Sequence, residues 1–325
     1  MGEADIAAIS VLLEAASLAD GHRALGEHQW LDLVQGGREG FAGFVARASG
    51  REHVAAYAQI SRGSDASWAV EYVVHPRWRS EGGELPRDLM RTALGEIAAQ
   101  GGGHVHLWVP KPGPVDDAVA EAVGMRRGRE LIQMRRVLPV TEEAASITVR
   151  PFEPGTDEPA WLEVNNRAFR DHPEQGSWDM ATLCERERQP WFDPSGFLLY
   201  ERGGRLAGFC WTKVHEPDDD GEPEGLTGQL GEIYVIAVDP DFQGHGLGRQ
   251  LVLAGLASLF ERGVSTGMLY VDNDNEAARK LYTSIGFVDD HTDRAYVTDI
   301  APAVTGAPRG RAGGPVGPTS VKPGS

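Results

Sequence analysis

Apolar positions in the second half of the chain change their spacing at one point. Ile233–Val238 is a continuous apolar run, which is typical of a strand buried on both faces, and Asp239-Pro240 ends it. Further along, apolar residues recur at helical spacing until Gly263, which predicts a helix. The helical stripe consists of Leu247, Leu251, Ala254 and Leu259.

The segment between this strand and this helix reads Gln243-Gly244-His245-Gly246-Leu247-Gly248-Arg249. Its glycines let main-chain N–H groups face an anion without interference from a Cβ atom, and the start of the helix adds positive potential. A P-loop would need Lys and then Ser or Thr after its last glycine, but Gly248 is followed by Arg249 and Gln250. The spacing of the glycines also differs from the Gly-x-Gly-x-x-Gly of a dinucleotide-binding fingerprint. The segment therefore predicts a diphosphate cradle built mostly from backbone, with a plain tight turn as the alternative.

A second strand and a second helix follow. Met268–Val271 is a short apolar run, and Asp272–Asn275 supplies residues that favour a turn and a helix N-cap. Gly286 is expected to close the helix with a left-handed C-cap. The positions of this helix that recur at helical spacing are Ala278, Leu281, Tyr282 and Ile285.

Two strings in this region resemble the signatures of the GNAT N-acetyltransferase family. The first is Gln-x-x-Gly-x-Gly after Val-Asp-Pro, and the second is Asn275-x-Ala277-Ala278-x-x-Leu281-Tyr282-x-x-x-Gly286-Phe287. The resemblance implies acetyl-CoA as co-substrate, no metal, and an α/β (α+β) fold whose mixed, mostly antiparallel sheet is flanked by helices. The implied contacts to the coenzyme are Ile236, Ala237, Val238, Gln243, Gly244, His245, Gly246, Leu247, Gly248, Arg249, Asn275, Glu276, Ala277, Ala278, Arg279 and Lys280.

The same pattern occurs twice in the chain. Val73–Pro76 matches Ala237–Pro240 at a displacement of 164 positions, and Val105–Val109 matches Met268–Asp272 at 163. A chain of 325 residues also exceeds the usual size of one domain. The expected parts are tandem GNAT-like domains at 1–140 and 147–300 and a disordered Pro/Gly-rich tail at 301–325.

The first copy has lost much of the motif chemistry. Where it matches the glycine turn, Glu84 stands at the last glycine and Pro86 lies near the expected helix start, and segment 116–124 lacks the Leu-Tyr pair. A glutamate there opposes a diphosphate, and no tyrosine is available as an acid. We expect residues 1–140 to serve packing or to line the substrate site. The alternative is that they still bind acetyl-CoA without catalysing a reaction.

Charge and cysteine content narrow the partners. The net charge of −17 works against nucleic acid, because phosphate neutralisation drives that binding, and it permits a cationic or polyhydroxyl small molecule. Cys184 and Cys210 have neither metal-ligand nor disulfide spacing. No apolar run is long enough to span a membrane, and the N-terminus lacks the regions of a signal peptide. We expect a cytoplasmic monomer that acts on a small-molecule amine, although no motif reports on oligomeric state.

Acetyl transfer to an amine needs a base for the ammonium proton and an acid for the departing thiolate. Glu232 precedes the predicted strand, where its carboxylate could take the proton directly or through water, or could be a plain surface residue. An α-amino group has a pKa of about 7.7 to 8.0, so no strongly shifted base is needed. By periodicity Tyr282 is a half-buried core aromatic, but the resemblance implies that it protonates the thiolate. Main-chain N–H groups within Val235–Val238 are expected to meet the oxyanion.

Further strings resemble the mycothiol synthase family over almost the whole chain. They are His172–Gly176, Trp211–His215, Gly231–Val235 and Leu269–Val271, taken with the tandem arrangement. This resemblance implies acetylation of the cysteinyl amine of a cysteinyl glucosamine-inositol conjugate, the last step of mycothiol biosynthesis. The implied substrate contacts, whose polar groups suit a polyol, are Glu27, Glu174, Lys213, Glu232 and Tyr270.

Several alternatives stay open on the sequence. A tandem acetyltransferase of an aminoglycoside or of a protein N-terminus would share the acidic surface, and a non-catalytic acyl-CoA-binding module would share the cradle. The acidic segment 216–225 is expected to form either a substrate lid or a solvated loop. Each implied substrate contact has a structural or solvated alternative, and His172 and His215 receive no role.

Overall fold

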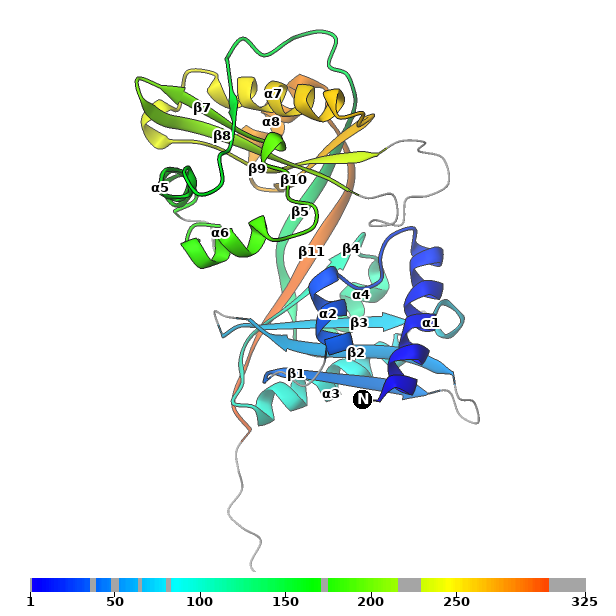
Figure 1. Ribbon diagram of the computed structural model, residues 1–325. Helices are drawn as coiled ribbons and strands as arrows, with labels where there is room; N and C mark the ends of the chain where they lie inside the picture. Colours follow the sequence, from blue (N-terminus) through cyan, green and yellow to red (C-terminus); the bar gives the residue numbers. More distant parts are fainter. Residues whose placement is uncertain are drawn as a thin grey trace, which may run out of the picture.

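The computed structural model describes residues 2–35, 39–47, 53–63, 66–79, 83–170, 175–215 and 229–303. Its strands form one sheet in the order β1-β2-β3-β4-β11-β5-β10-β9-β8-β7-β6 (Figure 1). The strands are β1 (Phe41–Arg47), β2 (Val54–Arg62), β3 (Trp68–Val74), β4 (Gly103–Pro110), β5 (Arg126–Val137), β6 (Arg150–Pro151), β7 (Phe197–Arg202), β8 (Arg205–Val214), β9 (Leu230–Val238), β10 (Thr266–Asp272) and β11 (Val288–Ile300). The helices are α1 (Glu3–Asp20), α2 (Glu27–Gln35), α3 (Glu84–Ala99), α4 (Pro114–Ala122), α5 (Glu158–Ala168), α6 (Met180–Glu187), α7 (Leu247–Glu261) and α8 (Glu276–Ile285).

The two halves of the sheet repeat one arrangement, which confirms the expected fold class. β1, β2 and β3 are antiparallel neighbours and β3 runs parallel to β4. In the same way β7, β8 and β9 are antiparallel and β9 runs parallel to β10. A short 3-10 turn and a helix connect each parallel pair, through η1 (Pro76–Trp78) and α3 in the first half and through η3 (Pro240–Phe242) and α7 in the second.

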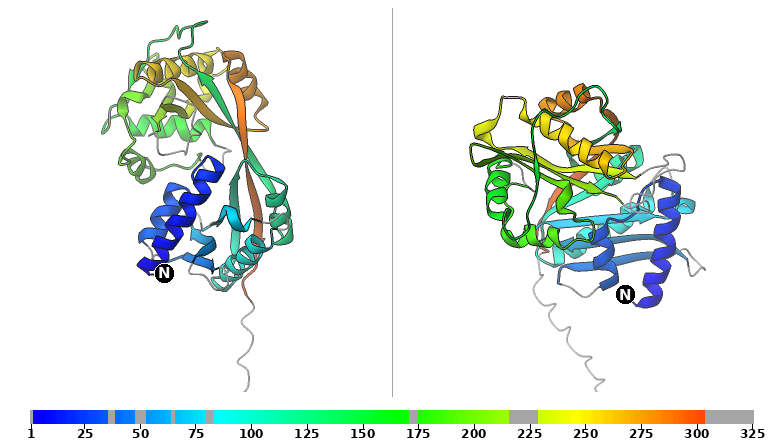
Figure 2. Two further views of the ribbon diagram at one scale, coloured as in Figure 1. Left: turned by 90° about the vertical axis from the view of Figure 1, so that its right-hand side faces the viewer. Right: turned by 45° about the horizontal axis from the view of Figure 1, so that its top comes forward.

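The strands in the middle of the sheet are exchanged between the halves. β5, which ends the first copy in sequence, pairs with β10 of the second copy, whereas β11 pairs with β4 of the first. β5 and β11 also pair with each other, and they run side by side through the centre of the molecule (Figures 1 and 2). The predicted domains at 1–140 and 147–300 are thus continuous in the sequence but not in space. β11 belongs to the second copy in sequence, yet it pairs with β4 of the first half. Of the predicted tail, residues 304–325 lie outside the described residues.

Hydrophobic clusters attach helices to both faces of the sheet (Figures 1 and 2). On one face α3 and α4 pack against the first half and α7 and α8 against the second. On the other face α1 and α2 pack against the first half and α5 and α6 against the second. No helix among the described residues combines the length and the apolar character that crossing a membrane requires.

The face covered by α5 and α6 has an aromatic core. Trp161 of α5 lies with its ring centroid 5.2 Å from that of Phe209 and 5.9 Å from that of Trp211. Trp211 stacks on Phe197 at 4.3 Å. Burial of large rings stabilises a fold by about 25 cal/mol per Å² of apolar surface, and edge-to-face pairs add to this. The cluster therefore fixes β7 and β8 beneath α5, and Trp191 extends it toward Tyr234 of β9, 5.1 Å away between ring centroids.

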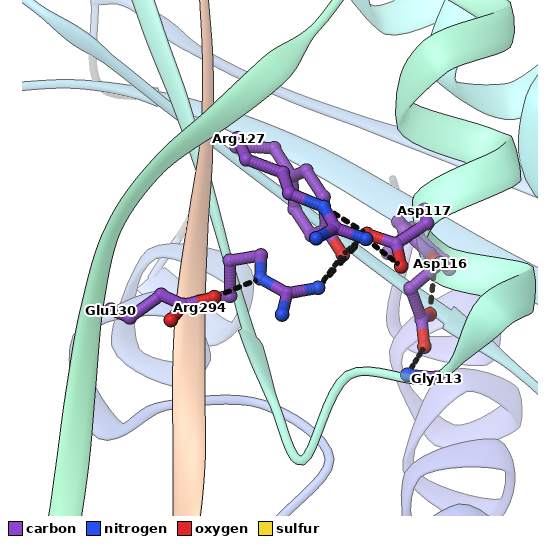
Figure 3. Close-up of polar contacts among 8 residues, drawn as sticks. Gly113, Asp116, Asp117, Arg127, Glu130 and Arg294 are labelled. Carbon is purple, nitrogen blue, oxygen red and sulfur yellow. Dashed lines mark hydrogen bonds and ion pairs between the residues drawn. The ribbon is translucent and has the colours of Figure 1, made fainter. Parts of the chain in front are cut away.

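A polar network fastens the exchanged strand β11 to the first half (Figure 3). Asp117 of α4 accepts hydrogen bonds from Arg294 Nη1 at 2.9 Å and from the Tyr296 hydroxyl at 2.8 Å. Arg127 of β5 donates to the same carboxylate, and Arg294 Nε donates to Glu130 Oε1 at 2.7 Å. Separation of β11 from α4 and β5 would leave these charged groups without partners, which is costly for partly buried ions.

Candidate functional site

β9 and β10 part at the level of Glu232. Within the described chain, the parallel ladder between them joins Leu230–Glu232 to Thr266–Met268. Beyond this point β9 continues along β8 while β10 continues along β5. A register shift leaves Tyr234 as an extra residue in β9, and such a bulge bends a strand and increases its twist. The two strands thus reach their C-terminal ends without a shared ladder.

The edge of β9 that turns toward β10 carries main-chain donors. Asp239 N–H donates to Ala207 O, on the side of β8, at 3.0 Å. Because successive N–H groups alternate between the two edges of a strand, those of Val238 and Ile236 are directed to the opposite edge. These residues are two of the predicted coenzyme contacts, with Ala237 between them.

The glycine turn stands at the end of β9 and opens α7. Gly246 is the N-cap of α7 with φ 73°, and Gly244 has φ 82°, a region that L side chains rarely adopt. A Cβ atom added at either glycine would meet no heavy atom within 4 Å, so the space in front of the turn is open. The turn is braced by Gln243 Nε2, which donates to Val238 O at 3.3 Å. As at any helix N-terminus, the first N–H groups of α7 have no carbonyl acceptor within the helix. They point out of the N-terminal end of α7, where the helix dipole is positive.

The first turn of α8 and the side chain of Arg249 flank this region. Asn275 caps α8 by accepting from Ala278 N–H at 3.1 Å. Arg249 pairs with Glu143 at 2.5 Å and donates to Ser284 Oγ at 2.7 Å, so its guanidinium is held by the segment after β5 and by α8. Among the other predicted contacts, Lys280 pairs with Glu276, Arg279 pairs with Asp289, and Gly248, His245, Leu247 and Ala277 lie in the two helix starts or the glycine turn.

Glu232 lies on the face of the sheet that α5 and α6 cover. It is the register partner of Lys213 in β8, so the two side chains share this face. His215, directly after β8, places Nε2 2.9 Å from Glu232 Oε2, and the two side chains are only 9% and 12% exposed. The Lys213 ammonium stands over the Trp191 ring, 4.9 Å from its centroid. Glu232 and Lys213 therefore lie side by side, and His215 joins them.

Tyr282 lies on the opposite face. It belongs to the hydrophobic cluster of α7 and α8, which also contains Leu251. The centroid of its ring lies 5.9 Å from that of Phe287. Burial, with a smaller effect from the nearby Cys210, raises the pKa of Tyr282 to about 12. The phenol therefore keeps its proton throughout the neutral range. Glu232 and Tyr282 thus lie on opposite faces of the second half of the sheet.

Tyr270 lies on the same face as Glu232. Met268 is the parallel register partner of Glu232, and Tyr270 follows it by two positions on β10. The Tyr270 hydroxyl accepts a hydrogen bond from Gln133 Nε2 of β5 at 2.8 Å, and the side chain is 39% exposed. Gln133 is buried, and sequence reasoning missed it, because only the strand exchange brings β5 beside β10.

Two predicted substrate contacts are not placed by the structure. Glu27 begins α2, but its side chain is not described, and Glu174 lies outside the described residues, as does His172. The acidic segment 216–225 also lies outside them. Among the residues that the structure does describe, no group of three or more His, Cys, Asp or Glu side chains could hold a metal ion.

The helix start of the first half has different surroundings, and residues 80–82, which precede it, lie outside the described residues. Gly83 caps α3 with φ 63°, but a Cβ atom added there would lie 2.8 Å from Val119 Cγ2 of α4. The Tyr72 hydroxyl of β3 donates to Asp116 Oδ1 of α4 at 2.8 Å. α3 begins at Glu84, so Pro86 lies in its first turn, where proline is tolerated.

Most of the chain is similar to known proteins. The model of the acetyltransferase (GNAT) family matches residues 159–287. The mycothiol acetyltransferase of Thermobispora bispora is 46% identical over 87% of this chain and 92% of that protein. The protein of the same name from Streptomyces coelicolor is 40% identical over 90% of this chain and 91% of its own length.

Solved structures share the fold. A GCN5-related N-acetyltransferase from Sphaerobacter thermophilus gives a TM-score of 0.70 at 24% identity, over 94% of this chain and 95% of that chain. The tandem GNAT protein from the clavulanic acid biosynthesis pathway gives 0.64 at 18% identity, over 92% of this chain and 95% of that chain. At these identities the likeness concerns the fold alone.

Proposed function

The chain belongs to the mycothiol acetyltransferase family of GNAT N-acetyltransferases, and from this premise we propose that it carries out the last step of mycothiol biosynthesis. The acetyl group of acetyl-CoA is transferred to the cysteinyl amine of a cysteinyl glucosamine-inositol conjugate. The observation that carries the proposal is the placement of Glu232 and Tyr282 on opposite faces of the sheet where β9 parts from β10. A base and an acid are thus available to one reacting centre from two sides.

The residues of the second half fit the coenzyme. The open space in front of Gly244 and Gly246 leaves room for phosphate oxygens beside the main chain, and the start of α7 favours their charge. The N–H groups of Ile236 and Val238 are free to meet an acyl-pantetheine chain as an additional strand would. Acetyl-CoA, when bound, supplies the activated acetyl group as a thioester. Arg249 supports the fit indirectly, because its ion pair with Glu143 holds the first turn of α7.

The reaction then divides between side chains. Glu232 accepts the proton of the substrate ammonium, directly or through water, which frees the lone pair that attacks the thioester carbon. Main-chain N–H donors on the β10 edge of β9 stabilise the negative charge on the carbonyl oxygen. Tyr282 donates its proton to the sulfur as the carbon–sulfur bond breaks, and it is reprotonated from solvent afterwards. The pKa of Tyr282, raised to about 12 by burial, keeps this proton available at neutral pH.

Polar groups on the face of Glu232 support recognition of a polyol. Lys213 can donate to hydroxyl oxygens, and the Tyr270 hydroxyl, held by Gln133, is fixed in direction. Glu27 and Glu174 remain proposed contacts of the same substrate. We propose a small-molecule substrate, action as a monomer and no nucleic-acid partner, in keeping with the net charge of −17. The free Cys184 and Cys210 fit the reducing conditions of the cytoplasm.

The first half is proposed to lack acetyl-CoA. Val119 of α4 packs against Gly83, where a phosphate would approach the turn. The Tyr72–Asp116 hydrogen bond spans the space between β3 and α4. This half contributes to the reaction through Gln133, which holds the Tyr270 hydroxyl, and by lining one side of the substrate site.

The proposal is tested with the purified full chain, acetyl-CoA and competing amines. The amines are the cysteinyl glucosamine-inositol conjugate, an aminoglycoside and a peptide with a free N-terminus, and acetylated products are identified by mass spectrometry, since the cysteinyl thiol would disturb a thiol assay. We expect kcat/KM for the cysteinyl conjugate to exceed that for the other amines by orders of magnitude. Preference for either competitor would reject the substrate, and absence of any acetylated product would reject the enzyme activity in favour of a coenzyme-binding module.

A further inference from the structure

His215 and Glu232 form a buried pair at the edge of the proposed reacting centre. His215 follows β8, and its main-chain N–H donates to Leu230 O of β9 at 2.9 Å, so the backbone of this residue is fixed by the ladder. Its ring places Nε2 2.9 Å from Glu232 Oε2. Both side chains are largely removed from solvent, where a hydrogen bond to a charged group is stronger than in water.

The geometry sets the roles of the two oxygens of Glu232. An ionised carboxylate only accepts hydrogen bonds, so with Glu232 ionised the proton between the two groups resides on Nε2 of His215. This bond occupies Oε2 and fixes the plane of the carboxylate. Oε1 then remains for the amine proton, directly or through water.

Among the described residues, the other groups around the pair do not duplicate this role. Lys213, the register partner of Glu232, holds its ammonium over the Trp191 ring. The phenol of Tyr234 on β9 has a raised pKa, chiefly from burial, with Arg186 of α6 and Glu232 as smaller influences, so it stays neutral. From β10 the register partner of Glu232 is the apolar Met268.

We propose that His215 is the positioning residue of the catalytic base, in a reaction that rests on the function proposed above. Its Nε2–H group occupies Oε2 of Glu232 and so orients the carboxylate, which leaves Oε1 directed to the amine. Loss of this donor leaves a carboxylate whose plane is no longer fixed, so the base is misaligned.

The test compares His215→Phe with His215→Gln in the full chain, with His104→Phe as a matched control. Gln retains an N–H donor near the place of Nε2, and His104 forms an exposed pair with Asp299 at 2.9 Å, far along the sheet in β4. For His215→Phe we expect kcat to fall roughly 10-fold to 100-fold, the size seen when a residue that supports a catalytic group is lost. The KM for both substrates should stay near that of the parent, His215→Gln should restore much of kcat, and His104→Phe should match the parent.

Two outcomes would overturn the proposal. One is a parent-like kcat in His215→Phe, and the other is a fall in kcat that His215→Gln does not restore, which would indicate packing alone. A second measurement needs no activity and no folded Phe variant: NMR titration of the histidine rings in the parent and in Glu232→Gln. The ring of His215 should titrate at lower pH once the carboxylate is gone, and an unchanged titration would reject the pair even if the cysteinyl conjugate were the wrong substrate.

Discussion

Tyr72 and Asp116 are joined by a 2.8 Å hydrogen bond at the positions that Ile236 and Ala278 occupy in the second half. Tyr72 and Ile236 are 164 positions apart, as in the repeat at Val73–Pro76, and Asp116 and Ala278 are 162 apart, as are the matching Gly124 and Gly286. In the second half the side chains of Ile236 and Ala278 are apolar, so they form no hydrogen bond between strand and helix. In the first half the hydrogen bond between Tyr72 and Asp116 closes the space between β3 and α4. The repeat has kept the frame of the fold and changed what lies between strand and helix.

Coenzyme stoichiometry follows from this difference. The full chain should bind one equivalent of acetyl-CoA in calorimetry, because the space in front of Gly246 is open, whereas Val119 packs against Gly83 at the start of α3. The variant Gly246→Asp should weaken binding at this single site. A second equivalent that persists in this variant would contradict the closed first half.

Gly246 separates two effects of substitution, backbone strain and charge. Its φ of 73° favours glycine, but asparagine tolerates this region, whereas other side chains pay roughly 1–2 kcal/mol there. Because no heavy atom lies within 4 Å of an added Cβ, both Gly246→Asn and Gly246→Asp should fold. The Kd for acetyl-CoA should rise about tenfold or more in the Asp variant relative to the Asn variant, since a carboxylate repels the diphosphate at short range. Equal affinities would place the phosphates elsewhere.

The substitution Tyr282→Phe removes the phenol hydroxyl, the proposed proton donor, and leaves the ring in place. The ring packs with Phe287 on the buried face of α8, and phenylalanine preserves that packing. We expect kcat to fall about 100-fold, within the range for general acid catalysis, with an unchanged Kd for acetyl-CoA and an unchanged melting temperature.

The alkaline side of the parent's pH profile gives an independent check of Tyr282. Its pKa of about 12 keeps the phenol protonated well above neutrality, so this group should cause no fall in kcat up to about pH 10. A basic limb near neutrality that disappears in Tyr282→Phe would contradict the buried position.

The sequence predicted what depends on local pattern. The strand-turn-helix around Gly246 and the capped helix after Asn275 follow from apolar spacing and glycine positions, and the structure has α7 from Leu247 and α8 from Glu276. The exchange of β5 and β11 could not be predicted, because both copies contain strands of the same character and the choice of partner is made by the global sheet. For the same reason the contact of Gln133 with Tyr270 left no local signal.

His215 illustrates a second limit. Its place after an apolar strand is visible in the sequence, but its bond to Glu232 depends on the register of β8 with β9, in which Lys213 faces Glu232. Register is set by the bulge at Tyr234 and by packing on the aromatic core, neither of which spacing along one strand reports.

The anchoring of β11 by Asp117 gives a prediction on stability and pH. Burial alone would raise the pKa of Asp117, but hydrogen bonds from Tyr296 and Arg127 outweigh it, so the pKa lies below its ordinary value. A carboxylate with a lowered folded pKa stabilises the fold above its unfolded pKa of about 3.9, and this stabilisation is lost as pH falls through the folded value. Asp117→Asn should therefore lower the free energy of unfolding at pH 7 by about 1–3 kcal/mol, the range for hydrogen bonds to charged groups.

Denaturant unfolding of the full chain at several pH values measures this effect. The difference between parent and Asp117→Asn should be constant from pH 7 down to about pH 5 and should shrink steadily below the unfolded pKa of about 3.9. Asp299→Asn serves as the control, because its exposed partnership with His104 lies on the same strand β11 and surface pairs contribute little. A difference that persists unchanged at low pH would mean that Asp117 acts through shape and not through charge, and the network of Figure 3 would then not be what holds β11 to the first half.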